Sequence, residues 1–295
     1  MAEFASLRSY ELFEDSVKTK ARFVHDGVVE EFLDAVVATI KPRLTVWPKG
    51  KRLFRAQIGC AQVGSAGPDD QIDENDVAFS FERMVPKAKY VPEGRVNPEY
   101  IPEGRVNPLG IPCLYLADTA SAAISEMHPR IGSYISLAVF ETADECQLVD
   151  CARDTTRSLG LERINEDGAS EPEPDAVTKE KGVWGDIGFA FSKPVSRDES
   201  HLDYVPTQIL AETFRRRGYH GIIYKTLLDE EGQNIALFDT QAANWIGPCL
   251  YRVKSAAMTS VKWETVEGYG KSWPDAIHSK IEEIDLEARS PATAR

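Results

Sequence analysis

From about residue 52 onward, short apolar segments typical of β-strands alternate with helical segments, and this alternation limits the fold more than any other feature. The strand signals lie at 53–58, 112–117, 133–140, 146–150, 219–224 and 233–238. A short helix is predicted after Asp118 or Thr119, and an amphipathic helix over 207–217, closed by Gly218. Strands and helices interspersed in this way predict a mixed α+β fold.

The segment before this region is helical in pattern. Apolar residues recur at helical spacing between residues 25 and 40, Asp26 can cap the helix, and Lys41-Pro42 ends the run. We expect an N-terminal helical extension (1–48), a main domain (49–258) and a C-terminal tail with a short helix (259–295). The N-terminal helices could dock on the main domain or form the face of a homodimer. The acidic, polar residues 160–183 are expected to form a surface loop.

Composition and charge disfavour nucleic acid and membranes as partners. Of the 295 residues 42% are hydrophobic and 27% charged, and the net charge is -13, which disfavours direct binding to nucleic acid or to an anionic membrane. No window approaches the roughly 20 apolar residues needed to span a bilayer. The N-terminal sequence also lacks the basic flank and apolar core of a secretory signal. We therefore expect a cytoplasmic protein.

Metal-binding and nucleotide-binding motifs are missing from the sequence. The five cysteines include no CxxC pair and the five histidines are far apart, so we expect free thiols and no metal site. Neither GxGxxG nor GxxxxGK[ST] is present, and no GxSxG elbow supports a hydrolase triad. The remaining candidates are arginines, a tyrosine, a glutamate and hydroxyl groups.

A tandem decapeptide places an arginine in a turn twice. Residues 90–99 (YVPEGRVNPE) and 100–109 (YIPEGRVNPL) each hold an arginine between a glycine and an Asn-Pro turn. Only the second copy continues into an apolar strand and then a short helix that ends in a glutamate. We therefore expect Arg105 to be the functional copy and Arg95 to belong to an inserted duplicate, although an exposed arginine can also simply face solvent.

The other candidates each have a structural alternative. Arg55 lies in an apolar strand pattern, so it forms either a structural ion pair or a phosphate clamp. Tyr115 is either a core residue or a surface on which a flat ligand ring stacks. Glu126 is either solvated or a partly buried carboxylate that stabilises a developing cation. Thr226 and Asn234 flank a predicted hairpin with a turn at 229–232 and could be turn formers or ligand contacts.

Together these segments resemble the RES-domain family. The resemblance runs through Leu53-Phe-Arg55, Gly104-Arg-Val-Asn-Pro-Leu-Gly-Ile-Pro-Cys-Leu-Tyr-Leu-Ala117 and Ala122-Ala-Ile-Ser-Glu126. It continues through Tyr204-Val-Pro-Thr-Gln208, Gly218-Tyr-His-Gly-Ile-Ile-Tyr-Lys-Thr226 and Gly232-Gln-Asn-Ile-Ala-Leu-Phe238. The motifs follow the family order and cover roughly residues 50 to 255.

The resemblance implies a fold related to ADP-ribosyltransferases and an activity on NAD as substrate. Characterised members of the family are toxins of bacterial toxin–antitoxin pairs that hydrolyse or phosphorolyse the nicotinamide–ribose bond, and their usual partner is a helix-turn-helix antitoxin. A protein ADP-ribosyltransferase and a non-catalytic binding module are the alternatives. In this comparison Arg55 and Arg105 match the two family arginines, Tyr115 the tyrosine and Glu126 the glutamate, while Thr226 stands where many members have serine. We expect Glu126, Tyr115 and Arg105 to be catalytic, and Arg55, Thr226 and Asn234 to bind substrate.

Overall fold

The structure, a computed structural model, describes residues 2–62, 77–80, 84, 101–154, 174–193, 201–229, 232–255, 259–263 and 281–285. The chain divides into two compact units. The first comprises residues 1–129 and 134–251, and the second comprises residues 130–133 and 252–295. The predicted boundaries at residues 48 and 258 stay predictions.

An eight-stranded mixed sheet forms the framework of the first unit. Its order is β1-β7-β8-β9-β5-β2-β6-β10. The strands are β1 (Leu44–Trp47), β2 (Arg52–Ile58), β5 (Leu114–Ala117), β6 (Tyr134–Thr142), β7 (Cys146–Asp150), β8 (Gly221–Lys225), β9 (Gln233–Leu237) and β10 (Ala243–Arg252). β7 pairs with β8 in parallel, whereas β8, β9, β5, β2 and β6 pair successively antiparallel. The predicted α+β class is confirmed.

Two small antiparallel ladders complete the strands. β3 (Ala61–Gln62) pairs with β4 (Val77–Ala78), and β11 (Thr259–Trp263) pairs with β12 (Ile281–Asp285) in the second unit. In the described part of the tail, residues 259–263 and 281–285 are therefore strands, and the short helix expected within the tail stays a prediction. A strand needs a partner that is distant in sequence, and the local pattern of apolar residues does not reveal that partner.

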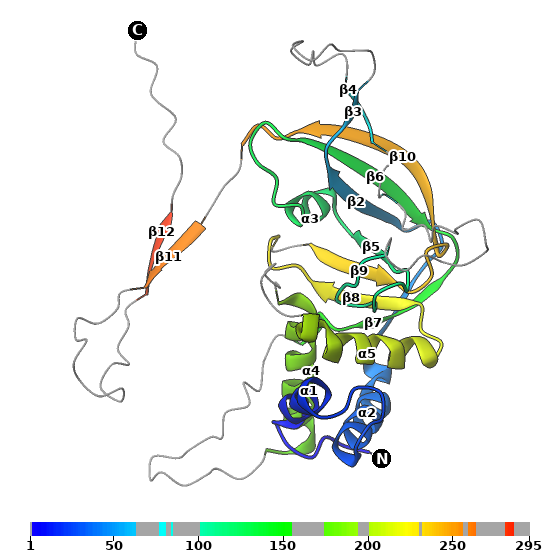
Figure 1. Cartoon of the computed structure of the whole chain (residues 1–295), viewed down its shortest axis with the longest axis vertical. Coiled ribbons are helices and arrows are strands. Elements are labelled where there is room, and N and C mark those ends of the chain that lie inside the picture. The colour runs from blue at the N-terminus through cyan, green and yellow to red at the C-terminus, as the bar shows by residue number, and fades with distance from the viewer. Residues whose placement is uncertain are drawn as a thin grey trace. The chain divides into compact units, whose positions relative to one another are not determined.

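Five α-helices lie in the described part of the chain. They are α1 (Ser9–Thr19), α2 (Gly27–Thr39), α3 (Ala120–Ser125), α4 (Ala176–Ser192) and α5 (Val205–Arg216). Figure 1 shows α4 and α5 beside β7 and β8, with α1 and α2 beyond them on the side away from the sheet, whereas α3 lies beside β2 and β5. None of the described helices is long and apolar enough to cross a membrane.

The N-terminal helices dock on the main sheet unit. Asp26 caps α2 as predicted, because its Oδ1 accepts a hydrogen bond of 3.0 Å from the Val29 amide. Phe13 of α1 and Phe32 of α2 stack with ring centroids 4.3 Å apart, inside the core cluster that also contains residues of α4, α5 and β8. Lys18 of α1 also bonds Asp203 at 2.6 Å, in the 3₁₀ turn His201–Tyr204 that leads into α5. Of the two roles considered for these helices, docking is the one seen.

Helix α4 occupies part of the predicted acidic loop. Asp175 caps it by accepting from the amides of Val177 and Thr178 at 2.9 and 3.1 Å. The prediction of a loop to residue 183 is therefore wrong from residue 176 onward. Glycines lower helix propensity, and α4 contains three of them. At Gly188 the reason is tertiary: an added Cβ would collide with the Cys151 carbonyl oxygen, so glycine permits close packing.

Candidate functional site

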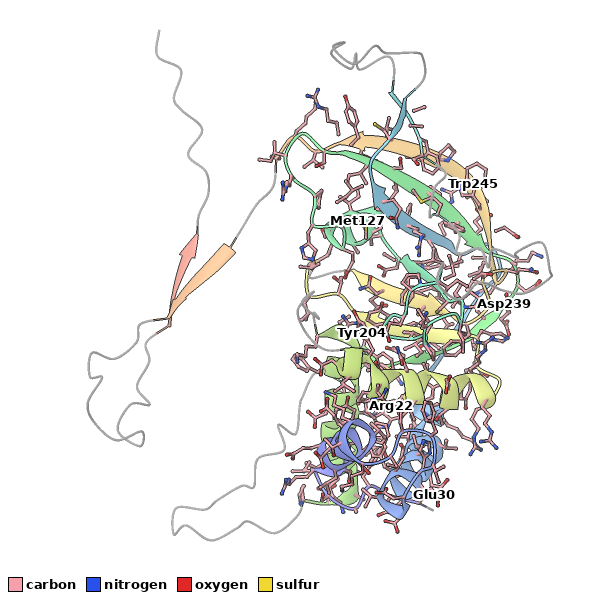
Figure 2. The ribbon with its side chains drawn as sticks, viewed as in Figure 1. Arg22, Glu30, Met127, Tyr204, Asp239 and Trp245 are labelled. Atoms are coloured by element: carbon pink, nitrogen blue, oxygen red, sulfur yellow. The ribbon has the colours of Figure 1, made fainter. Side chains whose placement is uncertain are left out.

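A pocket of about 200 Å³ opens among β2, β5, α3, β8 and β9. Four of the six predicted site residues line it, namely Arg55, Tyr115, Glu126 and Asn234. The other lining residues are Phe54, Ala56, Gln57, Leu116, Ala117, Ala123, Met127 and Tyr224. Figure 2 labels Met127, which follows Glu126 at the end of α3 and marks this side of the molecule.

The carboxylate of Glu126 is held between α3 and β9. Glu126 is the C-terminal cap residue of α3, and its Oε1 accepts a hydrogen bond of 2.7 Å from Asn234 Nδ2. At the other end of α3, Thr119 caps the helix by accepting from the Ala122 amide at 3.1 Å. Asp118 Oδ1 accepts from the Gln233 amide at 2.8 Å, which ties the start of α3 to β9. Because both ends of α3 are fixed to β9, the carboxylate has a defined position.

The floor of the pocket is a row of residues that lie opposite one another on four adjacent strands. Tyr224 of β8 faces Asn234 of β9, Asn234 faces Ala117 of β5, and Ala117 faces Phe54 of β2. Directly opposed residues project on the same side of a sheet. The small Ala117 side chain leaves the space between its larger neighbours open to a ligand.

Arg55 brings a positive charge to the pocket wall. Its Nη1 donates to the Tyr115 carbonyl oxygen at 2.8 Å, across from β2 to β5. This bond orients the guanidinium, whose planar fork suits two oxygens of a phosphate.

The turn that carries Arg105 is fastened by hydrogen bonds on both sides. Tyr115 Oη donates to Asn107 Oδ1 at 2.7 Å and accepts from the Val106 amide at 2.9 Å. From α5, Gln208 Nε2 donates to the carbonyl oxygens of Gly104 and Asn107 at 2.9 and 3.1 Å. The Tyr115 hydroxyl therefore holds the turn through its hydrogen bonds, while the Tyr115 ring lines the pocket.

Arg105 itself lies outside the pocket lining. Its Nη1 donates to the Ala190 carbonyl oxygen at 3.2 Å and to the Lys193 carbonyl oxygen, at the C-terminal end of α4. Its other guanidinium nitrogens make no hydrogen bond to the described part of the chain. The expectation that Arg95 is a non-functional duplicate concerns a residue outside the described ones.

Thr226 also lies outside the pocket lining. It is buried, and its hydroxyl accepts from the Leu228 amide at 3.1 Å. This contact is that of a turn former, one of the two alternatives for this residue. Asn234, the other candidate of the hairpin, contacts Glu126 instead.

Burial keeps two tyrosines protonated at the site. It raises the pKa of Tyr115 and of Tyr224 well above the ordinary phenol value. The nearby Arg105 charge opposes the rise for both, and Glu126 adds to it for Tyr224. Both phenols can therefore donate a hydrogen bond at neutral pH.

Sequence reasoning missed Tyr224, Gln57 and Met127 of the pocket, and Asn107 and Gln208 of the turn. For Tyr224 a signal existed: a hairpin closed at residues 229–232 brings Tyr224 opposite Asn234.

In the described part of the chain, no group of three or more His, Cys, Asp or Glu side chains is arranged to hold a metal ion. The five cysteines are free thiols, as predicted.

Comparison with known proteins assigns the family. No curated protein shows a significant match to the chain. Among solved structures, the crystal structure of the M. tuberculosis MbcT–MbcA toxin–antitoxin complex contains a similar chain, with 12% identity, a TM-score of 0.35, and coverage of 74% of this chain and 92% of that one. The family model of the RES domain matches residues 81–248, more than half of the chain. The chain belongs to the RES-domain family.

Proposed function

We propose that this protein cleaves the nicotinamide–ribose bond of NAD, by hydrolysis or phosphorolysis, as the toxin of a toxin–antitoxin pair. The observation that carries the proposal is the pocket in which Arg55, the Tyr115 ring and the Asn234-held Glu126 carboxylate converge. RES-domain membership and the activity that the family resemblance implies support it further.

The chemistry requires little proton transfer at the leaving group. The C1″–N bond of the nicotinamide ribose breaks, and its electron pair neutralises the cationic nicotinamide ring as it leaves. The ribose becomes oxocarbenium-like, and an oxygen of water or phosphate then bonds to C1″, with release of a proton when water attacks. A fixed carboxylate such as Glu126 stabilises the developing positive charge.

The other residues bind and orient the substrate. Arg55 is proposed to bind a phosphate oxygen from the pocket wall, with Arg105 adding its charge from the anchored turn. The Tyr115 ring offers a surface for the nicotinamide or its ribose. Asn234 holds Glu126 through the 2.7 Å bond, and Thr226 closes the adjoining turn.

The test is to incubate the pure protein with NAD and to measure free nicotinamide, with and without added phosphate. Wild type is expected to release nicotinamide, and Glu126→Gln is expected to lower kcat roughly 10²-fold to 10³-fold with a small change in KM. Glu30→Gln is the matched control, because Glu30 is exposed on α2, well away from Met127 and the pocket (Figure 2). Intact NAD under both conditions would refute the proposal.

Two further experiments separate the alternatives. Transfer of label from the adenylate part of NAD onto a protein, lost in Glu126→Gln, would indicate a protein ADP-ribosyltransferase. A non-catalytic module predicts that cells tolerate expression of wild type and of Glu126→Gln equally.

We propose that a helix-turn-helix antitoxin in the cytoplasm controls the wild-type activity. Its co-expression should then relieve the growth arrest that expression of the wild-type protein causes.

A further inference from the structure

The two tyrosines of the pocket differ in where their hydroxyl groups bond. The Tyr115 hydroxyl is used twice within the protein, at Asn107 and at the Val106 amide. Tyr224 is 7% exposed and lines the same pocket, yet its hydroxyl makes no hydrogen bond to any residue in the described part of the chain. The Tyr224 hydroxyl is not among the fully buried side-chain atoms that lack a partner, so it is open to the pocket, where a bound ligand can take its hydrogen bond.

The surroundings of Tyr224 indicate which ligand group can supply it. Tyr224 lies opposite Asn234, the residue that bonds Glu126 Oε1. Glu126 Oε2 makes no hydrogen bond within the described residues. A phenol hydroxyl can both donate and accept, whereas the carboxylate only accepts. Two adjacent hydroxyls of a ribose match this pair, because one donates to the carboxylate and the other bonds the phenol.

The size of the pocket is consistent with this part of the substrate. Its volume of about 200 Å³ is below the range of roughly 300–1,000 Å³ for sites that enclose drug-sized ligands. A whole dinucleotide is larger than that, so the pocket holds one end of it. The ring of Tyr224 is fixed there by Phe191 of α4, with ring centroids 6.3 Å apart.

We propose that the Tyr224 hydroxyl bonds a ribose hydroxyl of the nicotinamide half of NAD, beside Glu126, and that Tyr115 is a positioning residue for the Arg105 turn. This inference rests on the proposed function, since it assigns a contact to the same substrate. Tyr224 thereby becomes a substrate-contacting residue that the family comparison of the sequence does not include.

The test compares wild type with Tyr224→Phe on NAD and on two analogues, each lacking one hydroxyl of the nicotinamide ribose. On NAD, kcat/KM of Tyr224→Phe is expected to fall about tenfold, the usual scale for one lost hydrogen bond. On the analogue that lacks the bonded hydroxyl, the two proteins are expected to agree within about twofold. The melting temperature should not fall, because the hydroxyl makes no internal hydrogen bond. Tyr219→Phe, outside the pocket and two residues before β8, is the matched control.

Three results would contradict the inference or the proposed function on which it rests. Equal turnover of NAD by wild type and Tyr224→Phe overturns the inference and leaves the proposed function standing. An equal loss on NAD and on both analogues overturns the ribose contact. Wild type that releases no nicotinamide overturns the proposed function. In that case calorimetric titration with ADP-ribose decides the inference, since about tenfold weaker binding by Tyr224→Phe upholds the contact and equal binding overturns it.

Discussion

The Arg105 turn and the pocket beside it are made of similar polar groups, but their hydrogen bonds go to different places. In the turn, Tyr115, Asn107 and Gln208 bond one another and the backbone. In the pocket, the Tyr224 hydroxyl and one oxygen of Glu126 have no partner in the described part of the chain. A satisfied network fixes geometry, whereas polar groups that line a pocket without a protein partner are available to a ligand. The comparison separates residues that position the site from residues that bind substrate.

Among the tests that separate the turn from the pocket, the two arginines of the repeat give the largest expected difference. Arg105→Ala removes a charge beside the pocket and the bonds to the end of α4, so kcat/KM for NAD should fall roughly 10-fold to 100-fold. Arg95→Ala should leave turnover nearly intact, because its copy does not lead into the strand with Tyr115. Steady-state nicotinamide release checks both. The reverse pattern would mean that the first copy is the functional one.

Gly104→Ala tests whether the turn is rigid. An added Cβ would lie 2.6 Å from Tyr115 Oη and 2.9 Å from Asn107 Oδ1, so it would separate the two groups that anchor the turn. The free energy of unfolding should fall by about 1–3 kcal/mol, measured by urea denaturation, and turnover should fall with it. Gly27→Ala is the matched control: its Cβ meets nothing within 4 Å at the start of α2, and it should raise stability by up to about 1 kcal/mol. If Gly104→Ala is as stable as wild type, the turn is not rigid.

The smallest expected effect concerns pH. Burial raises the pKa of Tyr224 above the ordinary phenol value of 10.0, so the hydroxyl stays protonated as the pH approaches that value. We therefore expect kcat/KM to show no alkaline loss at pH 10 from ionisation of this group. Stability behaves differently: above pH 10 the unfolded phenol ionises while the folded one does not, so the free energy of unfolding falls.

Tyr224→Phe is the control for this pH prediction. It should reduce the alkaline loss of stability, measured by urea unfolding at a series of pH values. A drop in wild-type turnover below pH 10 that is missing in Tyr224→Phe would show that the phenol ionises at its ordinary pKa.

Several local features could be predicted because their causes lie within a few residues. Asp26 caps α2 through an amide three positions on, and Thr119 caps α3 in the same way. Gly218 ends the predicted helix with a φ of +87°, a backbone conformation that glycine adopts easily. The antiparallel pairing of β8 with β9 was likewise predicted from the turn residues between the two strands. Helix α4 was not, because it contains Gly188, which is explained by packing on Cys151 and not by local propensity.

The sequence alone was sufficient for the α+β class, the RES-domain resemblance and the candidates Arg55, Tyr115, Glu126 and Asn234. It could not say what each polar group bonds, because those partners are far away along the chain. Asn234 and Glu126 are 108 residues apart, Gln208 and Gly104 are 104 apart, and Arg105 and Ala190 are 85 apart. The three-dimensional fold therefore assigned the Tyr115 hydroxyl to the turn and left that of Tyr224 facing the pocket. Local patterns record the preferences of neighbouring residues, whereas the role of a buried polar group depends on which distant residues the fold brings within hydrogen-bonding distance.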